Sequence, residues 1–139
     1  KNIDHGKGLK IADQVNADAD QVVSKTLAQN DFVSVTLFAF SKGEDISTHD
    51  SIGDAMVTVI EGCGKFIVDD KEYIVDIARK EVEEDGFIPR PFYMIELWEY
   101  VYILKAGETI IMPAKKPHSV HAVGAFKMML VVVFPLEQD

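Results

Sequence analysis

Short β-rich segments, separated by turn residues at close intervals, constrain the fold of this chain more than any other feature. Glycine, proline and aspartate interrupt the apolar sequence in stretches such as 41–45, 62–64 and 113–117. Val, Thr and aromatic residues favour strands, and many short strands with such punctuation predict an all-β barrel or sandwich. The strands predicted in this way are residues 21–27, 33–40, 46–51, 55–61, 65–68, 72–75, 108–112, 118–123 and 126–134.

Length and charge limit the class of protein. The chain has 139 residues, 47% of them hydrophobic, which is enough for one domain with a real core. A net charge of -9 argues against nucleic acid and anionic membranes as partners. No apolar stretch reaches membrane-spanning length, and the first residues lack the apolar region of a secretory signal. Cys63 is the only cysteine, so no internal disulfide forms, and we expect a cytoplasmic protein.

The middle of the chain departs from the β pattern. Residues 76–84 contain helix formers, and Gly86 is placed to end a helix. Residues 92–104 are densely apolar and aromatic, and their periodicity fits both a helix and a strand. We favour a helix for the centre of this run, because Glu96 and Glu99 then fall on one side.

Two histidines follow glycines in a repeated arrangement. Gly43 is followed by five residues and then His49, and Gly107 is followed by five residues, Pro113 and then His118. A glycine can turn the chain into a strand from which a histidine points inward. In a closed barrel, two such histidines from distant strands can meet at one interior point, where imidazoles bind a metal or a polar ligand.

With these motifs the sequence resembles the cupin superfamily, and especially the small single-domain bacterial cupins. The resemblance covers about residues 20–75 and 104–135. It implies a double-stranded β-helix of the jelly-roll, RmlC-like kind, and often a homodimer. The chain is then one cupin domain, residues 1–139, with a partly helical insertion at about 75–103. The motif positions matched are Gly43, His49 and Gly62, then Gly107, Pro113 and His118.

The sequence departs from the family pattern at the positions that matter for function. The family's usual metal site has three histidines and one glutamate, but Ser51 stands at the second histidine and Ala55 at the glutamate. The resemblance therefore implies a ligand pocket formed by His49, Ser51, Ala55 and His118. A divalent zinc, manganese, iron or nickel ion would need a third ligand besides the two histidines, because catalytic metal sites usually have three. Asp54 is the best replacement.

Simpler interpretations remain open for these residues. His49 and His118 fit equally well as interior histidines hydrogen-bonded to Ser51, Thr36 or water. Asp54 fits a turn cap. His121, three residues after His118, is expected to face the opposite side of the strand as a surface histidine.

Three functions follow from these alternatives. The first is a protein that binds a small molecule inside the barrel, which the missing ligands at Ser51 and Ala55 favour. The second is a metal-dependent enzyme of the dioxygenase or isomerase type, acting at His49 and His118. The third is a protein-interaction module that acts through the insertion, whose apolar residues must cover the barrel or pack against another subunit. The sequence leaves open whether the chain is an enzyme.

Overall fold

The computed structural model describes residues 3–68 and 101–136, with the backbone alone for residues 48 and 49. Nine strands and one short 3₁₀ helix make up this part of the chain. All strand pairs are antiparallel, which confirms the predicted all-β class. The elements are η1 (Ile11–Gln14), β1 (Val22–Gln29), β2 (Val33–Phe40), β3 (Asp45–His49), β4 (Asp54–Glu61), β5 (Cys63–Val68), β6 (Val101–Lys105), β7 (Thr109–Met112), β8 (His118–Ala122) and β9 (Phe126–Val133).

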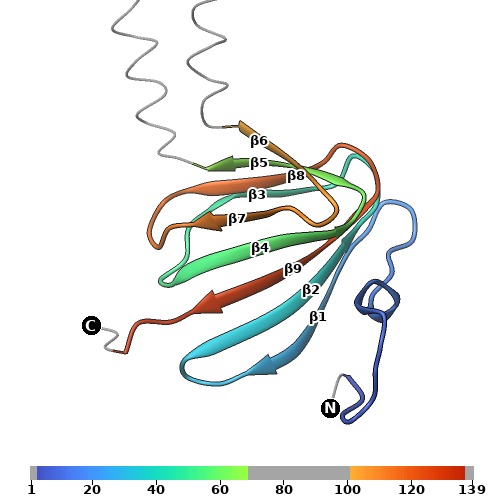
Figure 1. Cartoon of the computed structure of the whole chain (residues 1–139). Coiled ribbons are helices and arrows are strands. Elements are labelled where there is room, and N and C mark those ends of the chain that lie inside the picture. The colour runs from blue at the N-terminus through green and yellow to red at the C-terminus, as the bar shows by residue number, and fades with distance from the viewer. Residues whose placement is uncertain (1–2, 69–100, 137–139) are drawn as a thin grey trace, which may run out of the picture.

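Two sheets face each other across the core (Figure 1). One has five strands in the order β1-β2-β9-β4-β7, and the other has four in the order β3-β8-β5-β6. Neighbouring strands are often distant in sequence: β9 lies between β2 and β4, and β8 lies between β3 and β5. This topology therefore brings the first histidine motif, on β3, beside the second, on β8.

The predicted strands agree with the observed ones to within a few residues, with two local corrections. Cys63 was expected in the turn 62–64 but begins β5, because Gly62 alone makes the turn with a φ of +80°. Asp45 was expected in the turn 41–45 but belongs to β3, where its backbone pairs with that of His121. The predicted strand 72–75, the helix 76–84 and the centre of the run 92–104 lie outside the described residues.

The end of the apolar run 92–104 belongs to the barrel. β6 begins at Val101 and pairs with β5, with Ile67 opposite Val101 and Cys63 opposite Lys105. A deletion of the predicted insertion 75–103 would therefore remove most of β6. Residues 69–100 are the stretch that lies between the paired strands.

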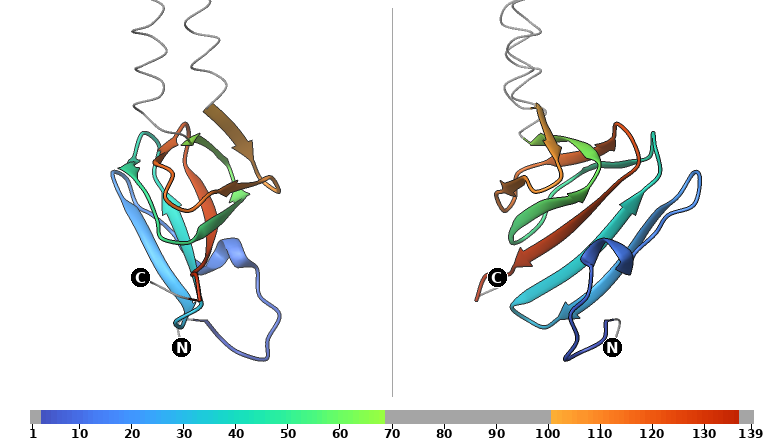
Figure 2. Two further views of the ribbon diagram at one scale, coloured as in Figure 1. Left: turned by 90° about the vertical axis from the view of Figure 1, so that its left-hand side faces the viewer. Right: turned by 45° about the vertical axis from the view of Figure 1, so that its right-hand side comes forward.

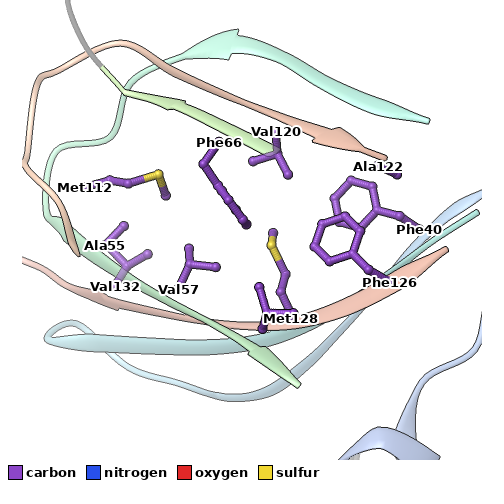
Figure 3. Close-up of a cluster of buried hydrophobic side chains, with 11 residues drawn as sticks. Phe40, Ala55, Val57, Phe66, Met112, Val120, Ala122, Phe126, Met128 and Val132 are labelled. Atoms are coloured by element: carbon purple, nitrogen blue, oxygen red, sulfur yellow. The ribbon is translucent and has the colours of Figure 1, made fainter. Parts of the chain in front are cut away.

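Aromatic side chains fill one end of the space between the sheets (Figure 3). Phe40 and Phe126 are backbone partners on β2 and β9, and their rings stack with centroids 4.6 Å apart. Phe66 meets Phe126 edge-on at 6.2 Å. A Cβ atom on Gly64 would lie 2.6 Å from Cε2 of Phe126, so the ring occupies the space that any other residue would need.

The N-terminal segment covers part of the outer face of the five-stranded sheet, where η1 lies against it (Figure 2). Val15 packs there with Leu37 and Ala39, which are almost completely buried. The Lys127 ammonium fixes this segment: it donates to Ala12 O at 2.6 Å and to Asn16 Oδ1 at 3.0 Å. Glu61 Oε2 lies 3.3 Å from the same Nζ atom.

Within the described ranges, no helix has the length and apolar character needed to span a membrane.

Candidate functional site

His118 begins β8 and lies inside the barrel, 3% exposed. Its Nδ1 atom is 3.1 Å from the carbonyl oxygen of Lys116. A carbonyl oxygen can only accept a hydrogen bond, so Nδ1 carries the proton and donates it. In the neutral ring Nε2 is then the acceptor, which is the atom able to bind a metal or a ligand's donor group. The loop before β8 therefore fixes the tautomer of His118.

His49 ends β3, directly opposite His118. The two residues are backbone partners in the β3–β8 ladder, after an irregularity in the register between Ile46 and His49. The backbones of the two motif histidines therefore lie close together, as predicted. The side chain of His49 is outside the described part of the structure, so a shared site for the two imidazoles stays a prediction.

A cavity lies beside His118 at the end of the barrel opposite the stacked phenylalanines. Its volume is about 80 Å³. Ala55, Val57, Met112, Met128 and Val132 form part of its wall. In Figure 3, Met112, Ala55 and Val132 lie away from the rings of Phe40 and Phe126, whereas Met128 lies beside Phe126. The full lining is Phe38, Ile46, Ser51, Ala55, Val57, Met112, His118, Val120, Met128, Leu130 and Val132. It is an apolar space with two polar side chains, those of Ser51 and His118.

Ser51 lies in the loop between β3 and β4, at the edge of this cavity. Its Oγ donates to the carbonyl oxygen of Gly53 at 2.5 Å, and its own carbonyl oxygen accepts from the amide of Lys115 at 2.8 Å. The second bond joins the loop after β3 to the loop before β8. Ser51 therefore joins the two motifs structurally as well as lining the cavity.

Asp54 and Ala55 begin β4 with opposite orientations. Asp54 is exposed, and its Oδ1 accepts from the amide of Ala114 at 2.8 Å. It is not among the cavity-lining residues. Ala55 is 2% exposed and places a methyl group in the cavity wall. Of the five residues predicted for the site, Ser51, Ala55 and His118 line the cavity. His49 is the backbone partner of His118, and Asp54 connects β4 to the 113–117 loop.

His121 lies on the outer face of β8, in hydrogen-bond distance of two polar side chains. Its Nδ1 is 2.9 Å from Asp45 Oδ1, and its Nε2 is 3.2 Å from Ser119 Oγ. Sequence reasoning placed His121 on the other side of the strand from His118 but missed both of these partners. The two-residue spacing of Ser119 and His121 was an available signal, because alternate residues of a strand share a face.

Sequence reasoning also missed most of the cavity wall. Met112 and Met128 are buried in the core, and their side chains also line the cavity. No pattern in the sequence distinguishes a methionine that fills a core from one that borders an empty space.

Comparison with known proteins places this geometry in a family. No family model and no curated protein matches the chain. Among solved structures, a protein of unknown function from Streptococcus pyogenes is 33% identical, with a TM-score of 0.73, over 99% of this chain and 95% of that one. A cupin superfamily protein from Desulfitobacterium hafniense is 24% identical, with a TM-score of 0.72, over 97% of both chains. The chain belongs to the cupin superfamily. An RmlC-like cupin from Desulfovibrio desulfuricans shares the fold at 20% identity, with a TM-score of 0.62, over 93% of this chain and 97% of that one.

Membership confirms the resemblance found in the motifs, and the fold is a double-stranded β-helix, as in these cupins. The residues present do not fit the family's usual metal site. Ala55 offers a methyl group where that site has a carboxylate, and the Ser51 hydroxyl is bonded to Gly53 O. Among the side chains that the structure describes, no three of His, Cys, Asp or Glu gather closely enough to hold a metal ion.

Proposed function

We propose that this cupin binds a small, mainly apolar molecule in the barrel interior, oriented by His118. The observation that carries the proposal is the cavity that has His118 and Ser51 in an otherwise apolar wall. Small-molecule sites in proteins combine apolar walls with a few placed polar groups in this way.

The size and polarity of the cavity define the class of ligand. A cavity needs about 10–15 Å³ to hold one water molecule. The cavity of about 80 Å³ therefore has room for several waters or a compact organic molecule. Because Nδ1 donates to Lys116 O, Nε2 of the neutral imidazole has the character of an acceptor. A ligand that carries one hydroxyl or amine group on a short hydrocarbon body matches both features.

Methionine methyl groups report binding directly. Met112 and Met128 line the cavity, whereas Met56 lies on the outer face of β4 and is 37% exposed. With ¹³C-methyl methionine labelling, we expect straight-chain alcohols of two to five carbons to shift the Met112 and Met128 signals saturably and to leave Met56 unchanged. If no probe in the series moves the Met112 and Met128 signals, the proposal is wrong.

Two variants and a matched control connect those shifts to the site. Ala55→Met extends a side chain into the cavity, and His118→Gln replaces the imidazole; both should weaken binding of the same alcohols at least about tenfold, which is the effect of losing roughly 1.4 kcal/mol. His5→Gln makes the same substitution at an exposed position near the N-terminus and should leave binding unchanged. Equal affinity in all three variants would show that the alcohols bind elsewhere.

A metal-dependent enzyme is the second candidate function, and the backbone pairing of His49 with His118 favours it. Elemental analysis of protein purified without chelators or nickel resin tests it. About one metal per chain, absent from a His49→Ala, His118→Ala double variant, would support a two-histidine site. No bound metal after incubation with zinc, manganese, iron and nickel salts would exclude this candidate.

We also propose that the protein is a homodimer formed through the outer face of the five-stranded sheet. Ile111, Met56 and Val131 lie opposite one another on β7, β4 and β9, and Ile111 is 54% exposed. These three side chains carry no charge, so a second copy of the chain can cover them without burying a charged group. Light scattering should show a dimer that Met56→Lys converts to a monomer, while Phe32→Lys, in an exposed turn, leaves it intact.

The interaction-module alternative depends on residues 69–100, which the structure does not describe, and it stays a prediction from the sequence.

A further inference from the structure

Three polar side chains form a hydrogen-bonded chain on the outer face of the four-stranded sheet. Asp45 Oδ1 is 2.9 Å from His121 Nδ1, and His121 Nε2 is 3.2 Å from Ser119 Oγ. A carboxylate only accepts, so Nδ1 is the protonated nitrogen of a neutral His121, and Ser119 donates its hydroxyl proton toward Nε2. This is the order of atoms by which serine hydrolases activate a nucleophile. We propose that Ser119, His121 and Asp45 form a catalytic triad in which Ser119 attacks small carboxylic esters.

The strand register builds this triad and separates it from the cavity. Asp45 and His121 are directly opposite on β3 and β8, and Ser119 shares a face of β8 with His121 because it is two residues away. His118 and Val120 alternate with them and face the cavity. The triad is therefore a second site on the other side of the sheet, and it is independent of the proposed ligand cavity.

The three side chains of the triad differ in their exposure to solvent. Ser119 is 5% exposed, and the side chain of His121 is 30% exposed. Little water competes for the serine hydroxyl, whereas the Asp45 side chain is 54% exposed, so solvent screens its interaction with the imidazole. The imidazole also retains contact with the solvent from which the second substrate, water, must come.

The neighbouring strands indicate the class of ester. Ile67 on β5 is the backbone partner of Ser119, and Val101 on β6 is the backbone partner of Ile67. Lys65 on β5 is the backbone partner of His121, and Ile103 on β6, which is 57% exposed, is the backbone partner of Lys65. Apolar residues beside the serine favour a short aliphatic acyl group. Lys65, at the register position opposite His121, adds a positive charge to the face of the sheet that carries the triad.

The reaction balances with water as the only co-reactant. Ser119 Oγ forms a bond to the ester carbonyl carbon while its proton passes to His121 Nε2. The bond from that carbon to the alkoxy oxygen then breaks, and the alcohol leaves with the proton from Nε2. Water attacks the acyl-serine and gives a proton to His121 Nε2, the acyl–Oγ bond breaks, Ser119 Oγ takes that proton back, and the carboxylic acid is released. Asp45 holds the tautomer of His121 and stabilises its protonated form.

Covalent labelling and ester turnover test the triad in the full chain. We expect an alkyl fluorophosphonate to add its phosphonyl mass to the peptide containing Ser119, in the folded protein and not in urea. We expect release of 4-nitrophenol from 4-nitrophenyl butyrate to stop in Ser119→Ala and to fall at least about a hundredfold in kcat in His121→Gln. Ser34→Ala, on β2, is the matched control and should keep both labelling and turnover.

The role of Asp45 needs a readout that general damage to the structure does not produce. In Asp45→Asn we expect kcat to fall with KM nearly unchanged, and Asp45→Glu to recover part of the loss, because the carboxylate acts through His121 and not on the substrate. No label on Ser119 in the folded wild-type protein, or turnover that persists in Ser119→Ala, would overturn the proposal. Ser119→Cys covers the case in which Ser119→Ala does not fold: its thiol should react with iodoacetamide faster than Cys63 does, and a slower reaction counts against the triad.

Discussion

Replacement of Lys127 by methionine should release the N-terminal segment from the barrel. The lysine side chain is only 14% exposed, and its ammonium donates to Ala12 O and Asn16 Oδ1. Hydrogen bonds from a charged donor contribute about 1.5–3 kcal/mol each. The ion pair with Glu61 adds at most about 1 kcal/mol, because the Glu61 side chain is 58% exposed.

The loss of stability is smaller than the sum of these terms. When the segment opens, its freed acceptors regain hydrogen bonds to water, so the loss cannot exceed the free energy with which the segment packs on the sheet. We expect Lys127→Met to lower the free energy of unfolding by about 2–3 kcal/mol. At about 3–4 °C per kcal/mol for a chain of this size, the melting temperature falls by roughly 6–12 °C.

Urea denaturation measures the free energy, and hydrogen exchange identifies the segment that opens. Amides in residues 11–17 should exchange faster in the variant, while those of β4 and β9 change little under native conditions. Lys42→Met removes the same charge at an exposed turn and should shift stability by less than about 0.5 kcal/mol. If Lys127→Met matches that control in both measurements, the ammonium does not hold the segment and the reasoning is refuted.

Three further substitutions test the core and the loop connections, each by urea denaturation. Phe126→Ala removes the ring that stacks on Phe40, so stability should fall by about 3–5 kcal/mol; a loss below 1 kcal/mol would contradict the packing described. Gly64→Ala brings a methyl group within 2.6 Å of the Phe126 ring, so it should cost about 1–3 kcal/mol, and an unchanged midpoint would mean that the ring moves freely. Asp54→Ala removes the acceptor of the Ala114 amide and should cost about 1 kcal/mol without changing metal content; a loss of bound metal would instead make Asp54 a ligand.

Local sequence patterns predicted the strands well, because they depend on signals carried by adjacent residues. Residues 33–40 alternate and end at turn residues, and they form β2 with the predicted bounds. The spacing of Gly107, Pro113 and His118 likewise predicted a histidine at the start of a strand, and His118 is there. The family resemblance then supplied the sheet arrangement, which no local pattern contains.

Contacts between distant segments were beyond sequence reasoning. The pairing of Asp45 with His121 depends on the register of β3 against β8, and nothing in residues 41–45 distinguished Asp45 from the turn residues before it. The Lys127 side chain donates to the backbone carbonyl oxygen of Ala12, which is far away in the sequence. Every residue has such a carbonyl oxygen, so the sequence does not indicate which one the lysine will meet. The cavity is an unfilled volume, which depends on how all its wall residues pack together.

The pairing of Ile67 with Val101 has a consequence for how this barrel tolerates change. The chain leaves β5 at Val68 and re-enters β6 at Val101, so both ends of residues 69–100 are anchored in one hairpin. Opposite residues of an antiparallel pair have Cα atoms about 4.5–5.5 Å apart. Each doubling of a connecting loop costs only about 0.6 kcal/mol of closure entropy. The β5–β6 junction is therefore an attachment point at which other segments can replace residues 69–100 while the nine strands keep their pairing. An Asn-Gly pair, which with Val68 makes a three-residue loop between Ile67 and Val101, a reporter domain with closely spaced ends and a binding peptide all fit this position.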